Sequence, residues 1–419
     1  MTEKKKKQEY AVIVGVQRTN DTKAVEDEIE EMESLLKTLN IKTKYKFIQH
    51  HKRLSATYLL GRGKIEKISQ LIQDECLTYL IIDHSLSPPQ MRNLNKKTQC
   101  TVLDREGVIL DIFANHAKTK EAKTQVEIAK LEYLLPRLAG AWTHFQRQTG
   151  GGVRARGMGE AQIEVDRRRA RQRISRLKKQ LEQIAKEKMT QRKSRRNEIK
   201  VSLVGYTNSG KTTLMKGLTR NNIEGKDELF ATLDARVRSL DPSTRPKILL
   251  SDTVGFIRNL PHNLVESFRS TLEEVVSGDL LLHVVDVSHP NYDLQMEVTN
   301  KVLEEIGAKD VPMLLIFNKI DQVEEEFLPR ILNKKYPNSI TVSALNDEDT
   351  SKLRQHIFNY FEKSFEKAVV KIDVNDQTTL SFIHRHCIVL GSDYEEEGEV
   401  TIEVRAPNSL LEKIKRYCI

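Results

Sequence analysis

Short runs rich in β-branched and aromatic residues alternate with helical patterns in the first part of the chain. The strand-like runs cover residues 11–16, 44–49, 79–83 and 101–104. Between the first two runs, apolar residues recur at steps of three and four: Val25, Ile29, Met32, Leu36 and Leu39. This spacing places them on one face of a helix. Strands that alternate with helices are typical of a parallel sheet, so residues 1–117 are predicted to form a small α/β domain.

The middle of the chain carries two longer helical patterns joined by a glycine-rich connection. The first apolar stripe, which stops near Pro136 and Gly140, contains Val126, Leu131, Leu134, Leu135 and Leu138. The second contains Ile174, Leu177, Leu181 and Ile184. Five of the 11 residues at positions 150–160 are glycine, and this stretch has no apolar run to bury. Residues 118–197 are therefore predicted to form a helical hairpin with an exposed, mobile tip.

The alternation of strands and helices resumes after the hairpin, with longer apolar strands. Strands are expected at residues 201–204, 248–251, 280–287, 313–317 and 339–342. This pattern predicts a second α/β domain, with a mostly parallel sheet, over residues 198–367. The tail has strand-like runs at residues 368–374, 387–390 and 400–404, followed by a helical pattern at residues 409–416. Residues 368–419 are therefore expected to form a small α+β domain, whose sequence indicates no chemistry.

Positive charge is concentrated in one segment of the chain. The 419 residues carry a net charge of +9, but residues 167–200 alone contain 15 Lys or Arg against 3 Asp or Glu. The rest of the chain is therefore slightly acidic. An anionic partner is expected at the second helix of the hairpin.

Composition also excludes several classes of protein. Apolar runs such as residues 280–285 are far shorter than the ~20 residues that cross a bilayer, so no membrane span is expected. The N-terminus lacks the apolar stretch of a secretory signal. The cysteines are scattered without Cys-x-x-Cys spacing, which argues against a zinc site and fits a reducing cytoplasm. They are Cys76, Cys100, Cys387 and Cys418.

Residues 205–212 read Gly-Tyr-Thr-Asn-Ser-Gly-Lys-Thr and match the phosphate-loop motif G-x-x-x-x-G-K-S/T between a predicted strand and a helix. Glycines let backbone N–H groups converge on phosphate oxygens, and the helix that follows presents its positive end. In this motif Lys211 is expected to reach the β and γ phosphates, and the Thr212 hydroxyl to ligate Mg²⁺. If the motif is considered alone, the alternative interpretation is that these residues form an ordinary tight turn rather than a phosphate loop.

Further elements follow in the order that a guanine nucleotide site requires. Asp252-Thr253-Val254-Gly255 ends an apolar strand, with a carboxylate near the metal and a glycine N–H near the γ-phosphate. Asn318-Lys319-Ile320-Asp321 ends another strand, where a carboxylate can accept both N–H donors of a guanine edge, which adenine cannot match. Ser343-Ala344-Leu345 follows the last strand and supports the base contact. Phe230-Ala231-Thr232-Leu233-Asp234 lies on a loop suited to closing over Mg²⁺ and the γ-phosphate.

Phe256 follows Gly255 at the position where Ras-like GTPases carry a glutamine that orients the attacking water. An apolar ring cannot position water, so two interpretations stay open. Phe256 is either a core residue in a protein that binds GTP but barely hydrolyses it, or part of a site whose water is positioned only when a partner docks. Asn208 has an amide oxygen suited to helping hold a monovalent cation such as K⁺; the alternative is a loop-shaping role.

These motifs resemble the HflX family of translational GTPases over nearly the whole chain. The resemblance is carried by residues 205–212, 229–234 and 252–257, and by Gly151-Gly152, Arg156-Gly157, Gly159-Glu160 and Asp166-Arg167-Arg168. The last group is the most specific, because general GTPases lack a glycine-rich loop and a basic hairpin there. The resemblance implies a cytoplasmic GTP hydrolase that binds the large ribosomal subunit, contacts ribosomal RNA near the peptidyl transferase centre and splits stalled ribosomes.

The residues and the resemblance together define the candidate sites of a protein expected to be monomeric. GTP or GDP is expected to contact Gly205, Tyr206, Thr207, Asn208, Ser209, Gly210, Lys211, Thr212, Phe230, Ala231, Thr232, Leu233, Asp234, Asp252, Thr253, Val254, Gly255, Asn318, Lys319, Ile320, Asp321, Ser343, Ala344 and Leu345. By the resemblance, Thr212 and Thr232 ligate Mg²⁺. The expected catalytic groups are Lys211, Thr232 and Gly255. The expected RNA contacts are Arg154, Arg156, Arg167, Arg168 and Arg171.

The tip of the hairpin departs from the family pattern. Family loops commonly read Gly-Pro-Gly-Glu-Thr-Gln, whereas residues 157–162 read Gly-Met-Gly-Glu-Ala-Gln. One hypothesis is a paralogue that rescues ribosomes stalled by a drug, a form of antibiotic resistance. Two other functions stay open: a ribosome-assembly factor that does not hydrolyse GTP, and a regulatory switch whose basic hairpin binds an acidic protein or a membrane surface.

Overall fold

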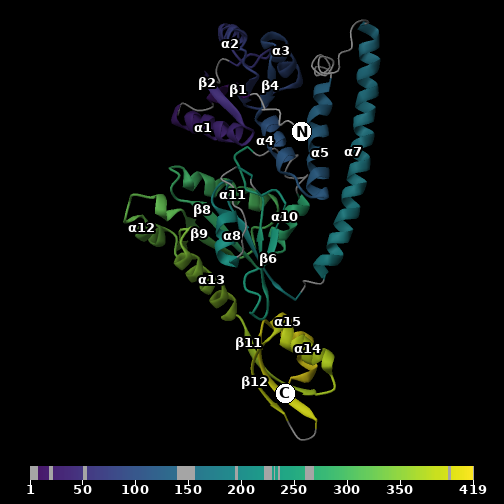
Figure 1. Cartoon of the computed structure of the whole chain (residues 1–419), viewed down its shortest axis with the longest axis vertical. Coiled ribbons are helices and arrows are strands. Elements are labelled where there is room, and N and C mark those ends of the chain that lie inside the picture. The colour runs from purple at the N-terminus through teal and green to yellow at the C-terminus, as the bar shows by residue number, and fades with distance from the viewer. Residues whose placement is uncertain are drawn as a thin grey trace, which may run out of the picture. The chain divides into compact units, whose positions relative to one another are not determined.

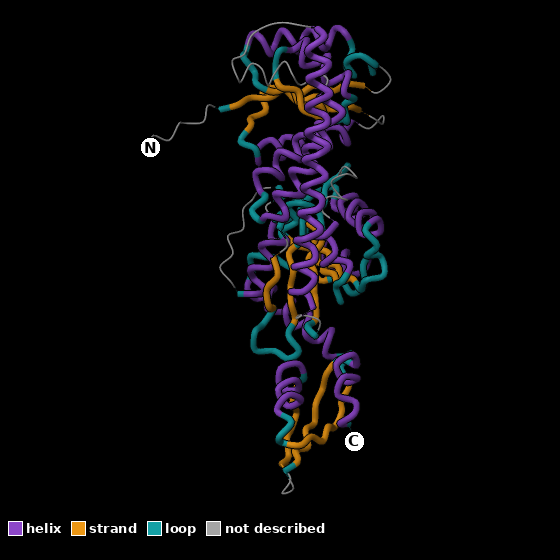
Figure 2. The backbone as a smooth tube through the Cα atoms, turned by 90° about the vertical axis from the view of Figure 1, so that its right-hand side faces the viewer, coloured by secondary structure: helices purple, strands orange, loops and turns teal. Residues whose placement is uncertain are grey.

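The computed structural model describes residues 8–17, 22–50, 54–138, 156–193, 197–220, 229–230, 232–234, 236–259, 269–394 and 398–418. Two compact units are formed, one mainly by residues before 185 and the other by residues from 185 onward. Within the described ranges the strands form three separate sheets, drawn in orange in Figure 2.

The first unit contains a four-stranded parallel sheet (Figure 1). Its strands are β1 (Glu9–Gln17), β2 (Ile41–His50), β3 (Tyr79–Asp83) and β4 (Thr101–Asp104), in the order β2-β1-β3-β4. The helices of this part are α1 (Thr22–Thr38), α2 (Arg62–Asp74), α3 (Pro88–Thr98) and α4 (Arg105–His116). Residues 11–17 of β1 are all buried, as expected for a central strand of a parallel sheet. The predicted parallel α/β sheet is confirmed.

A pair of helices follows the sheet along the chain. They are α5 (Lys120–Leu134), extended by the short helix η2 (Leu135–Arg137), and α7 (Arg156–Lys193). Ion pairs join them at Arg173 with Glu127, 2.8 Å, and at Lys178 with Glu132, 2.8 Å. The apolar stripe of α7 faces inward at Leu177, which is 2% exposed.

The second helix starts earlier than the sequence pattern predicts. Residues 156–160 are helical rather than part of an exposed loop, although Gly157 and Gly159 lower the local helix propensity. A long helix adds one hydrogen bond for each further residue once its nucleus has formed, so a turn with two glycines is retained. Residues 139–155, which include most of the expected tip, lie outside the described residues.

The second unit contains a six-stranded sheet in which only the edge strand β6 is antiparallel. Its strands are β5 (Ile199–Val204), β6 (Arg236–Ser239), β7 (Ile248–Asp252), β8 (Leu280–Asp286), β9 (Met313–Asn318) and β10 (Ile340–Thr341), in the order β10-β9-β8-β5-β7-β6. Its helices are α8 (Lys211–Thr219), α10 (Arg269–Val276), α11 (Tyr292–Glu305), α12 (Leu328–Lys335) and α13 (Asp347–Glu362). Leu203, Leu250 and Leu282 of neighbouring strands pack with Leu214 and Leu353 from α8 and α13 in one core. The carboxyl ends of the parallel strands therefore meet on one edge, where ligands bind in open α/β sheets.

The last part of the described chain forms a small antiparallel sheet with two α-helices and a short 3-10 helix. Strands β11 (Glu366–Asp373), β13 (Glu399–Ala406) and β12 (Ile388–Tyr394) lie side by side in that order. The accompanying helices are α14 (Gln377–His386), α15 (Asn408–Ile414) and η4 (Lys415–Tyr417). Alternate residues of β13, including Val400 and Ile402, are buried, which is the period expected for a sheet with one covered face.

The fold class predicted from the sequence is confirmed: an α/β sheet, a pair of helices, a second α/β sheet that is mostly parallel, and an α+β end. None of the helices in the described ranges combines the length and apolar content that a bilayer crossing needs. The domain boundaries at residues 117, 197 and 367 stay predictions.

Asp104 joins three elements of the first unit. Its side chain is fully buried and accepts hydrogen bonds from Leu86 N at 3.2 Å, Gly107 N at 2.9 Å, Tyr133 Oη at 2.8 Å and Arg137 Nη2 at 3.2 Å. These donors satisfy the carboxylate, which would otherwise be costly to bury. Burial and the neighbouring Asp104 charge raise the pKa of Tyr133, so its hydroxyl remains a donor. Asp104 thereby ties α5 and η2 to the edge of the sheet.

We predict that Tyr133→Phe lowers the free energy of unfolding of the first unit by about 2 kcal/mol, because a buried carboxylate loses a charge-assisted bond. Urea denaturation followed by circular dichroism measures the change. Tyr10→Phe is the matched control: Tyr10 is 39% exposed and its hydroxyl has no hydrogen bond to a described residue, so a change within about 0.5 kcal/mol is expected. Equal effects of the two variants would contradict the role of Asp104.

Candidate nucleotide-binding site

The loop between β5 and α8 has the backbone of a phosphate loop. Gly205 and Gly210 have φ of 147° and 90°, in the region that glycine adopts easily. A Cβ atom on Gly205 would lie 2.2 Å from the Val284 carbonyl oxygen, and one on Gly210 would lie 2.2 Å from Asn318 Nδ2. Both positions therefore require glycine for two independent reasons.

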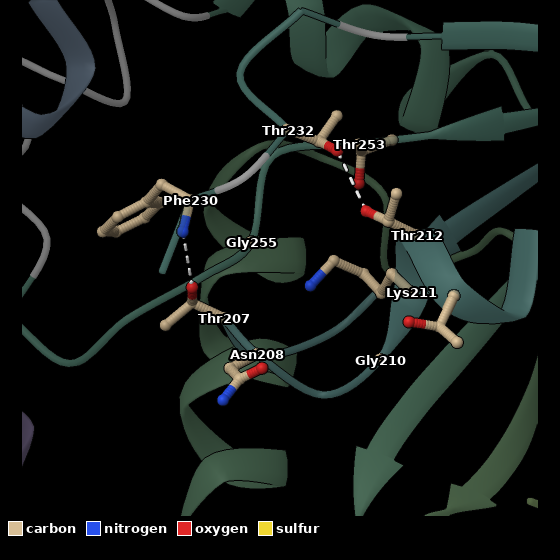
Figure 3. Close-up of a pocket in the computed structure, with 10 residues that line it drawn as sticks. Thr207, Asn208, Gly210, Lys211, Thr212, Phe230, Thr232, Thr253 and Gly255 are labelled. Atoms are coloured by element: carbon tan, nitrogen blue, oxygen red, sulfur yellow. Dashed lines mark hydrogen bonds between the residues drawn. The ribbon is translucent and has the colours of Figure 1, made fainter. Parts of the chain in front are cut away.

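Lys211 closes this loop from inside. Its Nζ donates to the carbonyl oxygens of Tyr206 at 2.7 Å and Gly205 at 3.1 Å (Figure 3 shows the side chain). Burial lowers the pKa of Lys211 to about 8, against a smaller opposing effect of the Asp252 charge. Burial also raises the pKa of Asp252. A buried cation and a buried anion that are both pushed toward neutrality suit a ligand that brings negative phosphates and a positive metal ion.

A cluster of hydroxyl and carboxylate oxygens lies beside Lys211. Thr212 Oγ1 is 2.8 Å and Thr232 Oγ1 is 2.7 Å from Asp252 Oδ2, and the two hydroxyl oxygens are 3.0 Å apart. Asp252 Oδ1 is buried and has no hydrogen-bond partner in the described part of the chain. Neighbouring ligands of an octahedral ion with bonds of about 2.1 Å lie about 3.0 Å apart, and oxygen ligands are those that Mg²⁺ prefers. The arrangement therefore fits a magnesium ion.

The Asn318 side chain connects the phosphate loop with the loops that follow β9 and β10. Its Nδ2 donates to the Ser209 carbonyl oxygen at 2.8 Å, and its Oδ1 accepts from Ala344 N at 2.9 Å. Next along the chain, Lys319 forms an ion pair with Asp286 at 2.7 Å. Asp286 is the last residue of β8 and was not predicted as a site residue. Its position at the end of an apolar strand, on the same sheet edge as the other site residues, could have indicated it.

The expected base-contacting residues differ in how exposed they are. Asp321 is exposed in the short helix η3 (Ile320–Gln322), and Leu345 is 76% exposed. Ser343 is buried and packs its loop through its backbone amide, which donates to Asp349 Oδ2 at 2.8 Å. Asp321 is therefore available to a ligand at the surface.

One cavity gathers much of the predicted site (Figure 3). It is lined by Thr207, Asn208, Gly210, Lys211, Thr212, Phe230, Thr232, Thr253 and Gly255, and by Thr213, which was not predicted. Leu233 and Val254 are buried beside these residues in sequence, and Asp234 is half-buried. Ala231 lies outside the described residues. The residues predicted for the phosphates and the metal thus come together, whereas residues 318–321 and 343–345 are not among those that line this cavity.

Phe256 is a core residue, 2% exposed. Its backbone continues the pairing between β5 and β7: Thr207 N donates to Phe256 O at 2.7 Å, and Phe256 N donates to Gly205 O at 3.1 Å. The buried ring cannot orient a water molecule. This bridge between two distant motifs was not predicted, because it depends on the register of two strands rather than on local sequence.

His283 lies on β8 opposite Val204 and is 1% exposed. Burial, together with the Lys211 charge, lowers the pKa of His283 to about 3, so its imidazole is neutral at physiological pH. It therefore supports the base of the phosphate loop without adding charge.

The expected RNA contacts are distributed along the second helix of the pair. Arg167 is half-buried on α7, and Arg168 and Arg171 are exposed. Arg156 begins this helix, but its side chain is outside the described part, as is all of Arg154.

We predict that Asp321→Asn shifts base preference from guanine toward xanthine, because an amide presents a donor to the oxygen that xanthine carries at position 2. Competition between GTP and XTP for binding measures the shift. Lys211→Ala is the comparison: it removes the charge that faces the phosphates and should weaken both nucleotides equally. An Asp321→Asn variant that keeps its preference for GTP would remove Asp321 from the base site.

Comparisons with known proteins agree with this geometry. Family models match in chain order: GTP-binding GTPase N-terminal over residues 26–114, GTP-binding GTPase Middle Region over residues 116–195, and 50S ribosome-binding GTPase over residues 200–319. The GTPase HflX of Gluconacetobacter diazotrophicus is 39% identical over 97% of this chain and 97% of its own. The GTPase HflX of Escherichia coli is 38% identical over 95% of this chain and 94% of its own.

A solved structure of a GTP-binding protein from the archaeon Sulfolobus solfataricus in complex with GDP is 28% identical, covers 84% of this chain and 98% of its own, and has a TM-score of 0.45. The relatives of known sequence match nearly the whole chain, and the matched regions include the helix pair as well as the nucleotide site. The chain therefore belongs to the HflX family and is a GTP hydrolase.

Proposed function

We propose that this GTPase binds the large ribosomal subunit, splits or rescues stalled ribosomes, and hydrolyses GTP faster when the ribosome is bound. The single observation that carries this proposal is the combination, in one chain, of a domain that matches the 50S ribosome-binding GTPase model and a strongly basic helix, α7. The proposed partner places the protein in the cytoplasm, partly associated with ribosomes.

The cations of α7 fall into two groups. Arg173 and Lys178 are already neutralised by glutamates of α5. Five others are exposed and form no ion pair with a described residue: Arg168, Arg171, Arg176, Lys179 and Lys186. The helix therefore presents charge that its own fold does not use, which favours contact with RNA phosphates. Arg167, Arg154 and Arg156 complete the proposed RNA surface.

The nucleotide roles follow from the site. We propose that Thr212 and Thr232 hold Mg²⁺ with Asp252 close to them, and that Lys211 and the Gly255 amide face the γ-phosphate. When bound, the ion would supply positive charge to the phosphate oxygens as negative charge develops on them. Asn318 and Asp321 recognise guanine, and the remaining residues of the loops at 205–212, 230–234, 252–255, 318–321 and 343–345 complete the pocket. Because the buried Phe256 cannot orient water, free protein turns over slowly.

Asn208 is proposed to help hold K⁺ in the same cavity, where its side chain lies beside Thr207 and Lys211 (Figure 3). A monovalent cation there would supply positive charge that the site lacks opposite a leaving phosphate. We predict that ribosome-free turnover rises when Na⁺ is exchanged for K⁺ at fixed ionic strength, and that Asn208→Ala removes the difference. Phosphate release measures both rates. Equal rates in the two salts would exclude the cation.

Subunit splitting distinguishes the main proposal from the other functions. Purified 70S ribosomes are sedimented through sucrose gradients with the protein and a non-hydrolysable GTP analogue. Separate 30S and 50S peaks are the expected result. Stable binding to 50S without splitting would favour an assembly factor, and no ribosome binding would favour a regulatory switch with another anionic partner. A second gradient with drug-stalled ribosomes tests the resistance hypothesis.

We predict that Arg168→Ala combined with Arg171→Ala weakens 50S binding and reduces the salt slope by about 2, because each lost phosphate contact removes about one unit. Pelleting with large subunits across a salt series measures both quantities. Lys301→Ala with Arg330→Ala is the matched control, since both residues are exposed cations on α11 and α12. GTP affinity of the free protein should stay unchanged in both variants. Equal loss of binding in the control would mean that only total charge matters.

A further inference from the structure

Two consecutive side chains of the phosphate loop bind the backbone of two other segments that contribute residues to the cavity lining. Thr207 Oγ1 accepts a hydrogen bond from Phe230 N at 3.0 Å, drawn as a dashed line in Figure 3. Tyr206 Oη accepts one from Arg258 N at 2.9 Å. Both side chains are buried, with Thr207 7% and Tyr206 4% exposed. The backbone shape of a phosphate loop does not depend on either hydroxyl. Their role is therefore sought in the two segments whose backbone amides they accept.

The first contact fixes a residue in a costly conformation. Phe230 has φ of 56°, a left-handed backbone that costs a non-glycine residue roughly 1–2 kcal/mol. The amide of Phe230 donates to Thr207 Oγ1, and the residue is only 2% exposed. A conformation of this kind persists only where surrounding contacts enforce it. The Thr207 hydroxyl is therefore one of the groups that determine the path of this loop.

That path sets the position of Thr232, two residues further along. Thr232 is 6% exposed and its hydroxyl donates to Asp252 at 2.7 Å. With Phe230 anchored at Thr207, the intervening chain is too short to let Thr232 move far from Thr212 and Asp252. Thr207 thus acts on the proposed metal ligands through the backbone of Phe230.

The second contact fixes the segment that follows Gly255. Besides Tyr206 Oη, the backbone atoms of Gly205 and Thr207 bind Phe256, so three hydrogen bonds hold residues 256–258 to the phosphate loop. A Cβ atom on Gly255 would lie 2.8 Å from Thr207 Cα, which shows how closely this segment approaches the loop. The Gly255 amide is therefore placed by the loop itself.

We infer that Thr207 and Tyr206 are positioning residues for GTP hydrolysis. Their hydroxyls hold Phe230, and through it the position of Thr232, and also the Gly255–Arg258 segment, in place before the γ-phosphate makes its own contacts. The inference deepens the proposed nucleotide site, and it requires no ribosome. Its failure is therefore distinguishable from failure of the ribosomal proposal.

The test compares Thr207→Val with Thr207→Ser. Valine keeps the shape of threonine but leaves the buried Phe230 amide without its acceptor, which should lower ribosome-free kcat roughly tenfold. GDP affinity should stay within about twofold, because backbone groups rather than this hydroxyl are expected to bind the phosphates. Serine keeps the hydroxyl and should restore most of kcat. Activity is measured as phosphate release at saturating GTP and Mg²⁺.

Hydrogen exchange gives a readout that a general loss of stability would not produce. With residue-level resolution on the GDP-bound protein, Thr207→Val should expose the Phe230 amide while the Arg258 amide stays protected. Tyr206→Phe should do the reverse, with its own loss of kcat. The inference is overturned if Phe230 keeps its protection in Thr207→Val, if serine fails as badly as valine, or if both variants retain the kcat of the wild type.

Discussion

The buried side chain of Asn318 holds the nucleotide site together. One amide group binds the Ser209 carbonyl oxygen and the Ala344 amide, so three loops from different parts of the sequence share a single fixed point. Gly210 is required for this contact, because any side chain there would occupy the place of the Asn318 amide nitrogen. The Asn318 amide has a donor end and an acceptor end, and each end has its own partner in a different loop. The distance between the phosphate loop and the base loop is therefore set by the geometry of one neutral group rather than by charge.

The buried charges of Lys211 and Asp252 indicate which ligand charges the site needs. Lys211 and Asp252 are buried close enough to influence each other, and the pKa of each is moved toward the neutral form by burial. An internal ion pair would have stabilised both charges and left little affinity for a ligand. Here the hydroxyls of Thr212 and Thr232 lie on one oxygen of Asp252 while the other oxygen has no described partner. The folded protein therefore holds unfavourable electrostatics that a nucleotide with a bound cation would relieve.

Much of the architecture could be predicted from the sequence because it follows from the local spacing of apolar and polar residues. β3 and β4 have the predicted bounds, and the parallel sheets follow from alternating strands and helices. The helix α14 was not predicted, and neither was β6, which is a short edge strand. Nine of the ten residues that line the phosphate cavity were predicted from motifs of fixed spacing, and Thr213 was not. The contacts of Thr207 with Phe230 and of Tyr206 with Arg258 could not be, since they join positions 23 and 52 residues apart. The RNA contacts and the domain boundaries stay predictions.

The close approaches of the three site glycines have a consequence for how this chain can change during evolution. The atoms that a new Cβ would meet are the Val284 carbonyl oxygen at Gly205, the Asn318 amide at Gly210 and the Thr207 backbone at Gly255. None of them can be trimmed by a compensating substitution, because two are backbone atoms and the third is the group that joins the loops. A single substitution at any of these glycines therefore disturbs the site. A second substitution elsewhere does not remove the clash. Sequence divergence is therefore expected in segments without such contacts, where a new specificity can arise while the nucleotide site is inherited intact.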